Sequence, residues 1–580
     1  MPIQPTYGTL LNLITDKVFK VPEYQRFYSW KRKQRQDLFS DLVALSARPV
    51  DQQHFMATLV CFDTGETEQV GPINYRLFDI VDGQQRLTSL VILLKCLAGG
   101  GNLQDGTRTM VEQALVKADG NLILLQTNNE NRHLFAEFLT TGATPTEESI
   151  ETYADQNLRN AITESKKFVA SWEEETGSDI NHLAAILFNR LGFICWEIDD
   201  ERTVFSIFEV LNSRGLAVDW LDKTKAILME RAHSLSPTDA ARGAAINNLK
   251  AIWASIYKEL AKCSLSGDEV LRVTATLRHG PKGGKPQGAD DALQQLRSEC
   301  VEAGKEIEVS SELLDVTRRL ARIDRKKHLG PVKKVLQARI LAVSLDKANQ
   351  LGDSPIAGGP SEREKAMLQW ERVTCRIFGI GGKDSRSKVG EYVRLAAKVQ
   401  SRAEGAMTYA EVMSGLRHLG RDYQIASVIT SGLRCTAIYD DPELCRFLLW
   451  RYEEYLAGSL EHLNPVDRVS IWEAGAQNTI EHIFPQNPEE GGPWSGKMST
   501  DGEEKDHWSH VHRIGNLCLL SKELNQGNGS FAVKKRMYSA QALLMYNEIV
   551  SKDDWTLAEI EERESQICEW AEKAWGDLPD

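Results

Sequence analysis

The chain has 580 residues, which is too long for a single hydrophobic core because such cores stop growing at roughly 250–300 residues. Its 42% hydrophobic and 26% charged residues are typical of folded proteins and exclude a disordered or fibrous chain. The formal charge of −13 argues against a nucleic-acid partner, although net charge averages over several domains.

Neither the start of the chain nor its cysteines point to export. Residues Met1 to Tyr7 lack the basic and apolar segments of a signal peptide, and no run reaches the ~18 apolar residues of a membrane span. The ten cysteines contain no C-x-x-C pair, which argues against a disulfide framework and a thiolate zinc site. We therefore expect a cytoplasmic protein without a membrane partner.

The pattern predicts an α+β multidomain protein that is predominantly helical, in three blocks. The first block, residues 1–235, mixes β-like runs at 54–62, 75–81 and 191–198 with amphipathic helices. One such helix carries Val204, Ile207, Phe208 and Leu211 at the spacing of a single buried face. These features predict an α/β domain at the N-terminus.

Two dense polar and aromatic motifs in this block each join a strand to a helix. They are Val21-Pro-Glu-Tyr-Gln-Arg-Phe-Tyr-Ser-Trp30 and Ile80-Val-Asp-Gly-Gln-Gln-Arg-Leu-Thr-Ser-Leu90. Gly83 can adopt backbone angles closed to other residues, and the amides after it open a helix over 87–97 that favours anions. The arginines suit phosphate, and the aromatic rings of Tyr24, Tyr28 and Trp30 could stack on a base.

These motifs predict a nucleotide pocket that is not a P-loop, because no G-x-x-x-x-G-K-[ST] is present. The simpler alternative is a capped helix start whose arginine pairs with a carboxylate.

The middle block, residues 236–425, reads as helical, with Gly- and Pro-rich loops at 280–288 and 352–360. A run of basic residues between Arg318 and Lys334 could bind phosphate, although a solvated helix face is the commoner explanation.

The last block, residues 426–580, begins with a helix at 447–456 and changes character near Asn478. Four of the twelve histidines lie between positions 482 and 512. The segment Asn478-Thr-Ile-Glu-His-Ile-Phe-Pro485 is followed by a loop, by His512-Arg-Ile-Gly-Asn-Leu-Cys-Leu-Leu520, and by a helix that begins near Ser530. The predicted order is strand, loop, strand, helix.

Phosphodiester hydrolysis needs a base for water and a cation for the developing charge. His482 suits the base because its intrinsic pKa of about 6.5 leaves it neutral near pH 7. Glu481 and Asn525 offer the oxygen ligands that Mg²⁺ or Mn²⁺ prefers.

These pieces, with Phe531-x-x-Lys-Lys-x-x-Tyr538, resemble a ββα-metal (HNH, His-Me finger) nuclease domain at 478–540, in the variant where Asn replaces the last His. The resemblance implies that His482 is the general base, that Glu481 and Asn525 bind the metal, and that Asn516 fixes the loop. It directs Lys534 and Lys535 toward phosphate and leaves His512 a supporting role. The family's leading metal ligand is more often Asp, so Glu481 departs from the usual pattern at this position.

The N-terminal motifs, including Asp82-Gly-Gln-Gln-Arg86 and Phe208-Glu-Val-Leu-Asn-Ser-Arg-Gly215, resemble the ParB/sulfiredoxin-like domain of GmrSD-type restriction proteins. Together the two resemblances suggest a fused GmrSD-like type IV restriction enzyme, with relatives in bacterial phosphorothioate and BREX defence systems. The resemblance implies binding and hydrolysis of a nucleoside triphosphate (GTP, ATP or another) and also allows a homodimer. The implied nucleotide-binding residues are Tyr24, Gln25, Arg26, Trp30, Asp82, Gly83, Gln84, Gln85, Arg86, Asn212 and Arg214.

We therefore expect a nucleotide-regulated, metal-dependent endonuclease that nicks or cuts modified foreign DNA in anti-phage defence. Two alternatives stay open: a nucleotide-switched regulator that binds DNA or protein through an inactive nuclease-like domain, and an RNase-type toxin.

Overall fold

The computed structural model describes residues 5–575 except 71–72, 101, 118–121, 128–131, 201–202, 205–218, 326–329, 331, 333, 355–359, 401–406, 424–432, 434–437, 459–478, 501–502, 505–507, 521–526 and 541–542. The chain forms two compact units. The first unit is Met1–Ala275 with Gly288–Ala321, and the second is Thr276–Gln287 with Arg322–Asp580. The contacts thus divide the expected middle block between the two units.

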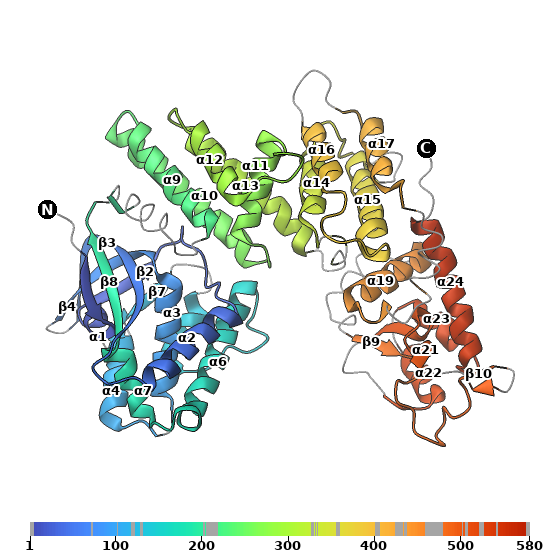
Figure 1. Cartoon of the computed structure of the whole chain (residues 1–580), viewed down its shortest axis with the longest axis horizontal. Coiled ribbons are helices and arrows are strands. Elements are labelled where there is room, and N and C mark those ends of the chain that lie inside the picture. The colour runs from blue at the N-terminus through green and yellow to red at the C-terminus, as the bar shows by residue number, and fades with distance from the viewer. Residues whose placement is uncertain are drawn as a thin grey trace. The chain divides into compact units, whose positions relative to one another are not determined.

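A mixed six-stranded sheet forms the frame of the first unit (Figure 1). Its order is β1 (Thr6–Thr9), β8 (Leu191–Ile198), β3 (His54–Val70), β4 (Ile73–Asp82), β2 (Lys17–Val21) and β7 (Leu125–Thr127). The pairs β8/β3, β4/β2 and β2/β7 are parallel, whereas β1/β8 and β3/β4 are antiparallel. The three β-like runs expected from the sequence all lie in this sheet, and a separate short pair joins β5 (Val116–Lys117) to β6 (Leu122–Ile123).

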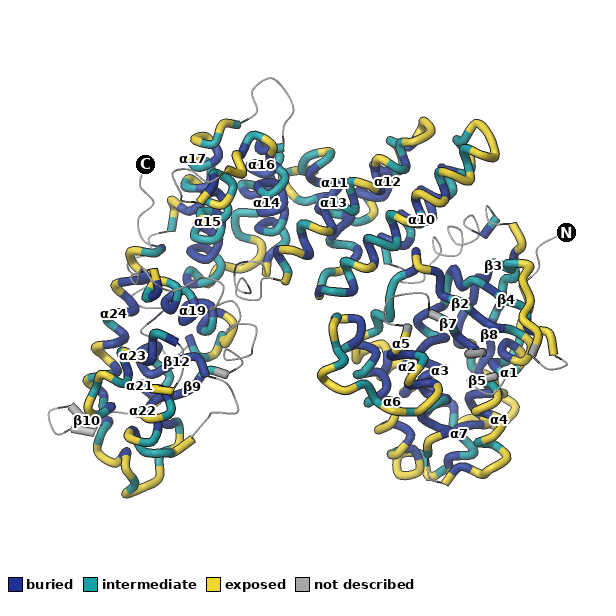
Figure 2. The backbone as a smooth tube through the Cα atoms, turned by 180° about the vertical axis from the view of Figure 1, so that it is seen from behind, coloured by how far each residue is buried: buried dark blue, intermediate teal, exposed yellow. Residues whose placement is uncertain are grey.

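Helix α3 (Gln84–Ala98) lies at the centre of this unit and is buried on nearly every side. It contacts α4 (Asp105–Leu115), α6 (Tyr153–Thr176) and α7 (Ile180–Asn189), and α2 (Arg32–Ser46) packs on α6. Figure 2 shows α3 almost wholly buried. Helices α1 (Leu10–Ile14) and α5 (Arg132–Thr141) complete this group.

Helix α9 (Trp220–Leu235) reaches the sheet through a separate apolar cluster. In this cluster Ala226 packs with Val60, Val81 and Ile198, which come from β3, β4 and β8. Helices α10 (Asp239–Ala261) and α12 (Ala289–Glu299) pack on α9. The boundary between the units falls within α11 (Gly267–His279) and α13 (Lys305–Arg325).

The second unit is helical apart from short strands, in agreement with the expected helical pattern. Its first helices are α14 (Leu336–Lys347), α15 (Glu362–Thr374) with a π-helical turn (Cys375–Ile380), α16 (Val389–Gln400) and α17 (Tyr409–Gly420). They are followed by α19 (Pro442–Gly458), α21 (Trp508–Val511), α22 (Phe531–Ser539), α23 (Met545–Val550) and α24 (Leu557–Trp575). Among the described residues, no helix has the length and apolar character needed to cross a membrane.

The expected order of strand, loop, strand and helix is present near the C-terminus. Strand β9 (Thr479–His482) pairs antiparallel with β12 (Leu517–Leu520), so that His482 lies opposite Leu517. A short pair, β10 (Ser499–Thr500) with β11 (Glu503–Glu504), lies within the connecting loop, and α22 follows the hairpin. The hairpin contacts α19, and the 3₁₀ turn Ile514–Asn516 contacts α24.

Two other expectations meet the structure in part. The predicted helix face at 204–211 lies outside the described residues except for Val204, which is buried. In the basic run, Arg319 pairs with Asp315, Arg322 with Asp346, and Lys334 with Asp441 and Glu443. The run is therefore partly neutralised by neighbouring carboxylates.

Candidate functional site

Strand β9 ends at His482, whose ring is held on both nitrogens. Its Nε2 lies 2.9 Å from Nδ1 of His512, and its Nδ1 lies 2.9 Å from the amide nitrogen of Gln486. Tyr439 stacks on His512 at 4.6 Å between ring centroids and meets the His482 ring edge-on at 4.7 Å. Two imidazoles, a phenol and an amide therefore form one polar cluster.

Asn516 fixes the loop that follows β9. Its Oδ1 accepts from the backbone N–H of Phe484, at 2.7 Å, and from the indole N–H of Trp555, at 3.1 Å. Its amide nitrogen donates to the carbonyls of Phe484 and Val511. Since the side chain is fully buried with its donors and acceptors used, Asn516 makes the contacts that a loop-fixing role requires.

Glu481 and His482 point to opposite faces because successive side chains alternate along a strand. Glu481 is 3% exposed, and its Oε1 accepts from Lys534 of α22 at 2.7 Å. The same ammonium donates to the backbone carbonyl of His482 at 2.7 Å. Burial raises the pKa of Glu481, and Lys534 opposes that shift.

The structure places Lys534 away from solvent, where it contacts Glu481 rather than an open phosphate position. Lys535 donates to the carbonyl of Lys552. Asn525 lies outside the described residues. Within the described ranges, no three His, Cys, Asp or Glu side chains lie together in a way that could hold a metal ion.

In the first unit, the two N-terminal motifs line one cavity of about 800 Å³. Gly83, at the start of α3, has φ +91°, and a Cβ atom there would lie 2.6 Å from Leu59 Cδ1. Only glycine can make this turn so close to β3. The predicted residues that line the cavity are Gln25, Arg26, Trp30, Asp82, Gly83, Gln84, Gln85 and Arg86.

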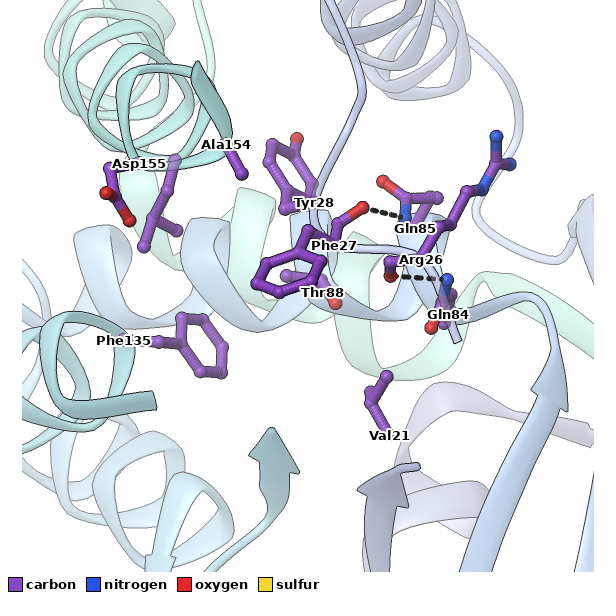
Figure 3. Close-up of a pocket in the computed structure, with 11 residues that line it drawn as sticks. Val21, Arg26, Phe27, Tyr28, Gln84, Gln85, Thr88, Phe135, Ala154 and Asp155 are labelled. Carbon is purple, nitrogen blue, oxygen red and sulfur yellow. Dashed lines mark hydrogen bonds between the residues drawn. The ribbon is translucent and has the colours of Figure 1, made fainter. Parts of the chain in front are cut away.

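Gln84 and Gln85 clamp one motif to the other, as Figure 3 shows. The amide nitrogen of Gln84 donates to the carbonyl of Arg26 at 2.9 Å, and that of Gln85 to the carbonyl of Phe27 at 3.0 Å. Gln85 Oε1 also accepts from the backbone N–H of Ser29. Gln84 Oε1 is buried and has no hydrogen-bond partner among the described residues.

Acidic residues of the α9 segment line the same cavity, and the sequence analysis did not single them out. Arg26 forms ion pairs with Asp219, at 3.6 Å, and with Asp222, at 3.3 Å. Burial, reinforced by Asp222, raises the pKa of Asp219 to about 6 and also raises that of Asp82. The side chain of Arg86 makes no hydrogen bond or ion pair to any other residue that the structure describes.

Lys225 does not line the cavity but contacts Gln25, which does. This lysine is 2% exposed and donates to Gln25 Oε1 at 2.8 Å, while Gln25 donates to the carbonyl of Val81. Burial lowers the pKa of Lys225 to about 8, against the effect of Asp222. The ring of Tyr24 lies beside Lys225 at 5.6 Å. Asp222 and Lys225 are both buried in α9, but the same helix also carries Lys223, Glu230 and Arg231, so the sequence alone does not single out this pair.

Asn212 and Arg214 lie outside the described residues, as does His507. His510 bonds to Ser509, and Trp508 is 55% exposed with its ring tilted against His512 at 5.9 Å. The sequence analysis did not identify Gln486 and Tyr439 as neighbours of His482, because neither residue belongs to a recognisable motif.

Comparison with known proteins finds a family match for the N-terminal part of the chain and another for the C-terminal part. The family model of the GmrSD restriction endonuclease N-terminal domain matches residues 7–229, and that of the GmrSD C-terminal domain matches residues 427–570. No match was found among curated proteins. The first match contains the cavity motifs and the second contains His482 and Asn516. The chain therefore belongs to the GmrSD-like type IV restriction endonucleases, a family of DNA-cutting enzymes of restriction and defence.

Proposed function

We propose that this protein is a nucleotide-regulated, metal-dependent endonuclease that cuts modified foreign DNA in anti-phage defence. The C-terminal nuclease is of the HNH (His-Me finger) type, and the N-terminal domain is a ParB/sulfiredoxin-like NTPase. The observation that carries the proposal is the position of His482 at the end of β9, beside a loop that the Asn516 side chain fixes through two hydrogen bonds to the backbone of Phe484.

His482 acts as the general base in this proposal. A water molecule gives a proton to the imidazole, and the resulting hydroxide attacks the phosphorus atom. The new P–O bond forms as the bond to the leaving ester oxygen breaks, and that oxygen takes up a proton. The products are an alcohol and a phosphomonoester, so no oxidant or other co-reactant is required.

A hard divalent cation beside Glu481 would have to take the place that the Lys534 ammonium now occupies. Two oxygens, Glu481 Oε1 and the His482 carbonyl, already converge at 2.7 Å on one cation, the ammonium of Lys534. Carboxylate and carbonyl oxygens are ligands that Mg²⁺ and Mn²⁺ prefer. We assign Glu481 and Asn525 as the ligands, and Mg²⁺ or Mn²⁺, when bound, stabilises negative charge on the phosphate.

The cavity of the first unit fits a nucleotide in size and chemistry. Ligand sites of this kind span roughly 300–1,000 Å³, and this cavity measures about 800 Å³. Arg86 and the first amides of α3 suit phosphate, Trp30 offers an aromatic face, and Gln84 Oε1 can accept a hydrogen bond from a base or sugar. Gln84 and Gln85 otherwise shape the wall, because their amide nitrogens hold the segment from Arg26 to Phe27.

The carboxylates of Asp82, Asp219 and Asp222 oppose the entry of a bare triphosphate, because like charges repel at short range. We therefore expect the nucleotide to bind as its magnesium complex, with Arg86 on the phosphates. Hydrolysis of this nucleotide would gate the nuclease of the second unit.

A cleavage assay tests the nuclease assignment. Genomic DNA with and without modified bases, and matched RNA, are incubated with Mg²⁺ or Mn²⁺ and each nucleoside triphosphate. We expect wild-type protein to cut a modified DNA and His482→Ala to cut it at least about 100-fold more slowly with DNA binding retained, since a general base contributes roughly 10²–10⁴-fold. Cleavage of RNA alone would favour the toxin, and binding without cleavage by wild-type protein would favour the regulator.

A further inference from the structure

A series of aromatic rings leads from the buried His482 to the protein surface. His482 is 6% exposed, and its ring lies 5.0 Å from that of His512, which is half-buried. The His512 ring in turn lies 5.9 Å from that of Trp508, which is 55% exposed. Among the tryptophans that the structure describes, Trp508 is the only one that is more than half exposed. A substrate that approaches His482 along this series meets Trp508 first.

The short helix α21 presents Trp508 from a fixed segment of backbone. Val511, one turn further along, is buried, and its carbonyl accepts from the amide nitrogen of Asn516 at 2.8 Å. The same Asn516 side chain fixes the loop that follows His482. Isolated apolar residues occur on many protein surfaces, but this indole is fastened to the same residue as the segment of the proposed base. Such shared support keeps a binding group in register with the chemistry.

The DNA that a restriction endonuclease cuts offers a flat aromatic base next to every phosphate. Consecutive nucleotides of one strand rise by about 3.4 Å. Since the two ring contacts that join His482 to Trp508 measure 5.0 Å and 5.9 Å, the indole reaches bases within about three nucleotides of the cut bond. Aromatic side chains stack on any base, because every base has a π-face. An exposed indole at this place therefore suits a nucleobase.

We propose that Trp508 is a DNA-contacting residue that stacks on a nucleobase beside the scissile phosphate. The stacked base fixes the strand, so that one phosphate is held at His482. This inference rests on the proposed role of His482 as the base, because that role places the cut bond beside the ring series. The contact depends on an aromatic face and not on charge, and it releases no counterion.

The test measures DNA binding by the full chain in the His482→Ala background, where we expect no cutting. Trp508→Ala should raise the Kd for the modified DNA that wild-type protein cuts by roughly 5–100-fold, as for alanine substitutions at stacked bases. The factor should be equal at low and high salt. Trp508→Phe, which keeps an aromatic face, should recover most of the loss.

Leu368→Ala is the matched control for the binding measurement. Leu368 lies in α15 of the same unit and is 54% exposed, so its removal deletes a similarly exposed apolar side chain away from the ring series. The Kd of this variant should equal that of the parent. Thermal unfolding of each variant verifies that it is folded.

Tryptophan fluorescence provides a signature that a packing role would not produce. Stacking on a base quenches an indole, so DNA should reduce the emission of His482→Ala. Trp508→Phe in the same background should remove this decrease. A decrease of the same size in both proteins would mean that other tryptophans respond to DNA, and it would overturn the proposed stacking.

Cleavage kinetics in protein that retains His482 complete the test. Trp508→Ala should raise KM by a factor comparable to the change in Kd, with kcat within about twofold. Unchanged Kd and KM would overturn the DNA contact, and so would a lower kcat with unchanged KM, because Trp508 would then act through His512. If His482→Ala still cuts, the proposed base is wrong, and the Kd measured with a metal chelator still decides the role of Trp508.

Discussion

The ion pair between Lys534 and Glu481 encloses two opposite charges inside the second unit. Lys534 is 0% exposed and Glu481 is 3% exposed. Removing one partner of such a pair leaves an uncompensated charge in a medium of low polarity, which is more costly than replacing both partners. The pair thus fixes α22 to the strand that ends in His482.

We expect Lys534→Met to lower the free energy of unfolding of the second unit by roughly 3–5 kcal/mol because Glu481 is left unpaired. The double variant Lys534→Met with Glu481→Gln should recover much of this loss. Denaturant unfolding followed by tryptophan fluorescence measures both values. Wild-type stability in Lys534→Met would show that Glu481 is protonated or solvated and that the ion pair contributes little.

At the level of single residues, the sequence identified which polar residues belong to the site but not which residues they contact. The Glu481–His482 pair and Asn516 follow from local motifs, and the structure brings His482 and Asn516 to the same hairpin end. The contact of Lys534 with Glu481 and that of Gln486 with Tyr439 span different elements. Such contacts depend on tertiary packing, which no local pattern encodes.

Helix α24 packs closely on the 3₁₀ turn that carries Asn516. A Cβ atom at Gly515 would lie 2.0 Å from the carbonyl oxygen of Ile560. Arg563 of the same helix donates to the carbonyls of Gly515 and Leu517. Helix α24 therefore fixes the 3₁₀ turn, and Asn516 in that turn fixes the loop after β9.

Gly515→Ala should force α24 away from this turn. Overpacking of this kind costs typically about 1–3 kcal/mol, and cleavage should fall with it because Asn516 moves. Gly458→Ala is the matched control, since a Cβ atom there meets nothing within 4 Å. Thermal unfolding and the cleavage assay are the two readouts. Equal stability of the two variants would mean that α24 can shift without cost.

Elements were predictable where the pattern is local. The runs at 54–62, 75–81 and 191–198 lie in strands, and the helix expected over 87–97 is α3, which extends from Gln84 to Ala98. The strand order β1-β8-β3-β4-β2-β7 was not predictable, because β3 pairs with β8 far along the chain. The hydrogen bonds from Gln84 and Gln85 to the carbonyls of Arg26 and Phe27 were not predictable either, because they join residues far apart in the sequence.

On the scale of the whole molecule, the two compact units carry the two proposed sites separately. The cavity lined by Arg26 and Arg86 lies in the first unit, and His482 lies in the second. A ligand stabilises only the folded part that binds it, to an extent set by its concentration relative to the Kd.

Scanning calorimetry of the full chain should therefore show a nucleotide effect on one transition. At 100 times the Kd, a triphosphate adds about 2.7 kcal/mol to the first unit, equivalent to a Tm rise of roughly 5 °C. The transition of the second unit, identified as the one that Gly515→Ala lowers, should stay in place. Arg86→Ala should abolish the rise, and an undiminished rise in that variant would remove Arg86 from the pocket.

Residues Thr276–Gln287, which are the last turn of α11 and the loop that leads to α12, are grouped with the second unit, although residues of the first unit both precede and follow them. Gly284 in this segment approaches Arg394 of α16, at 3.6 Å from an added Cβ atom. The polypeptide therefore crosses from one unit to the other three times. A gene truncated at one codon cannot yield either half intact, so separate expression would require excising this excursion and rejoining its ends.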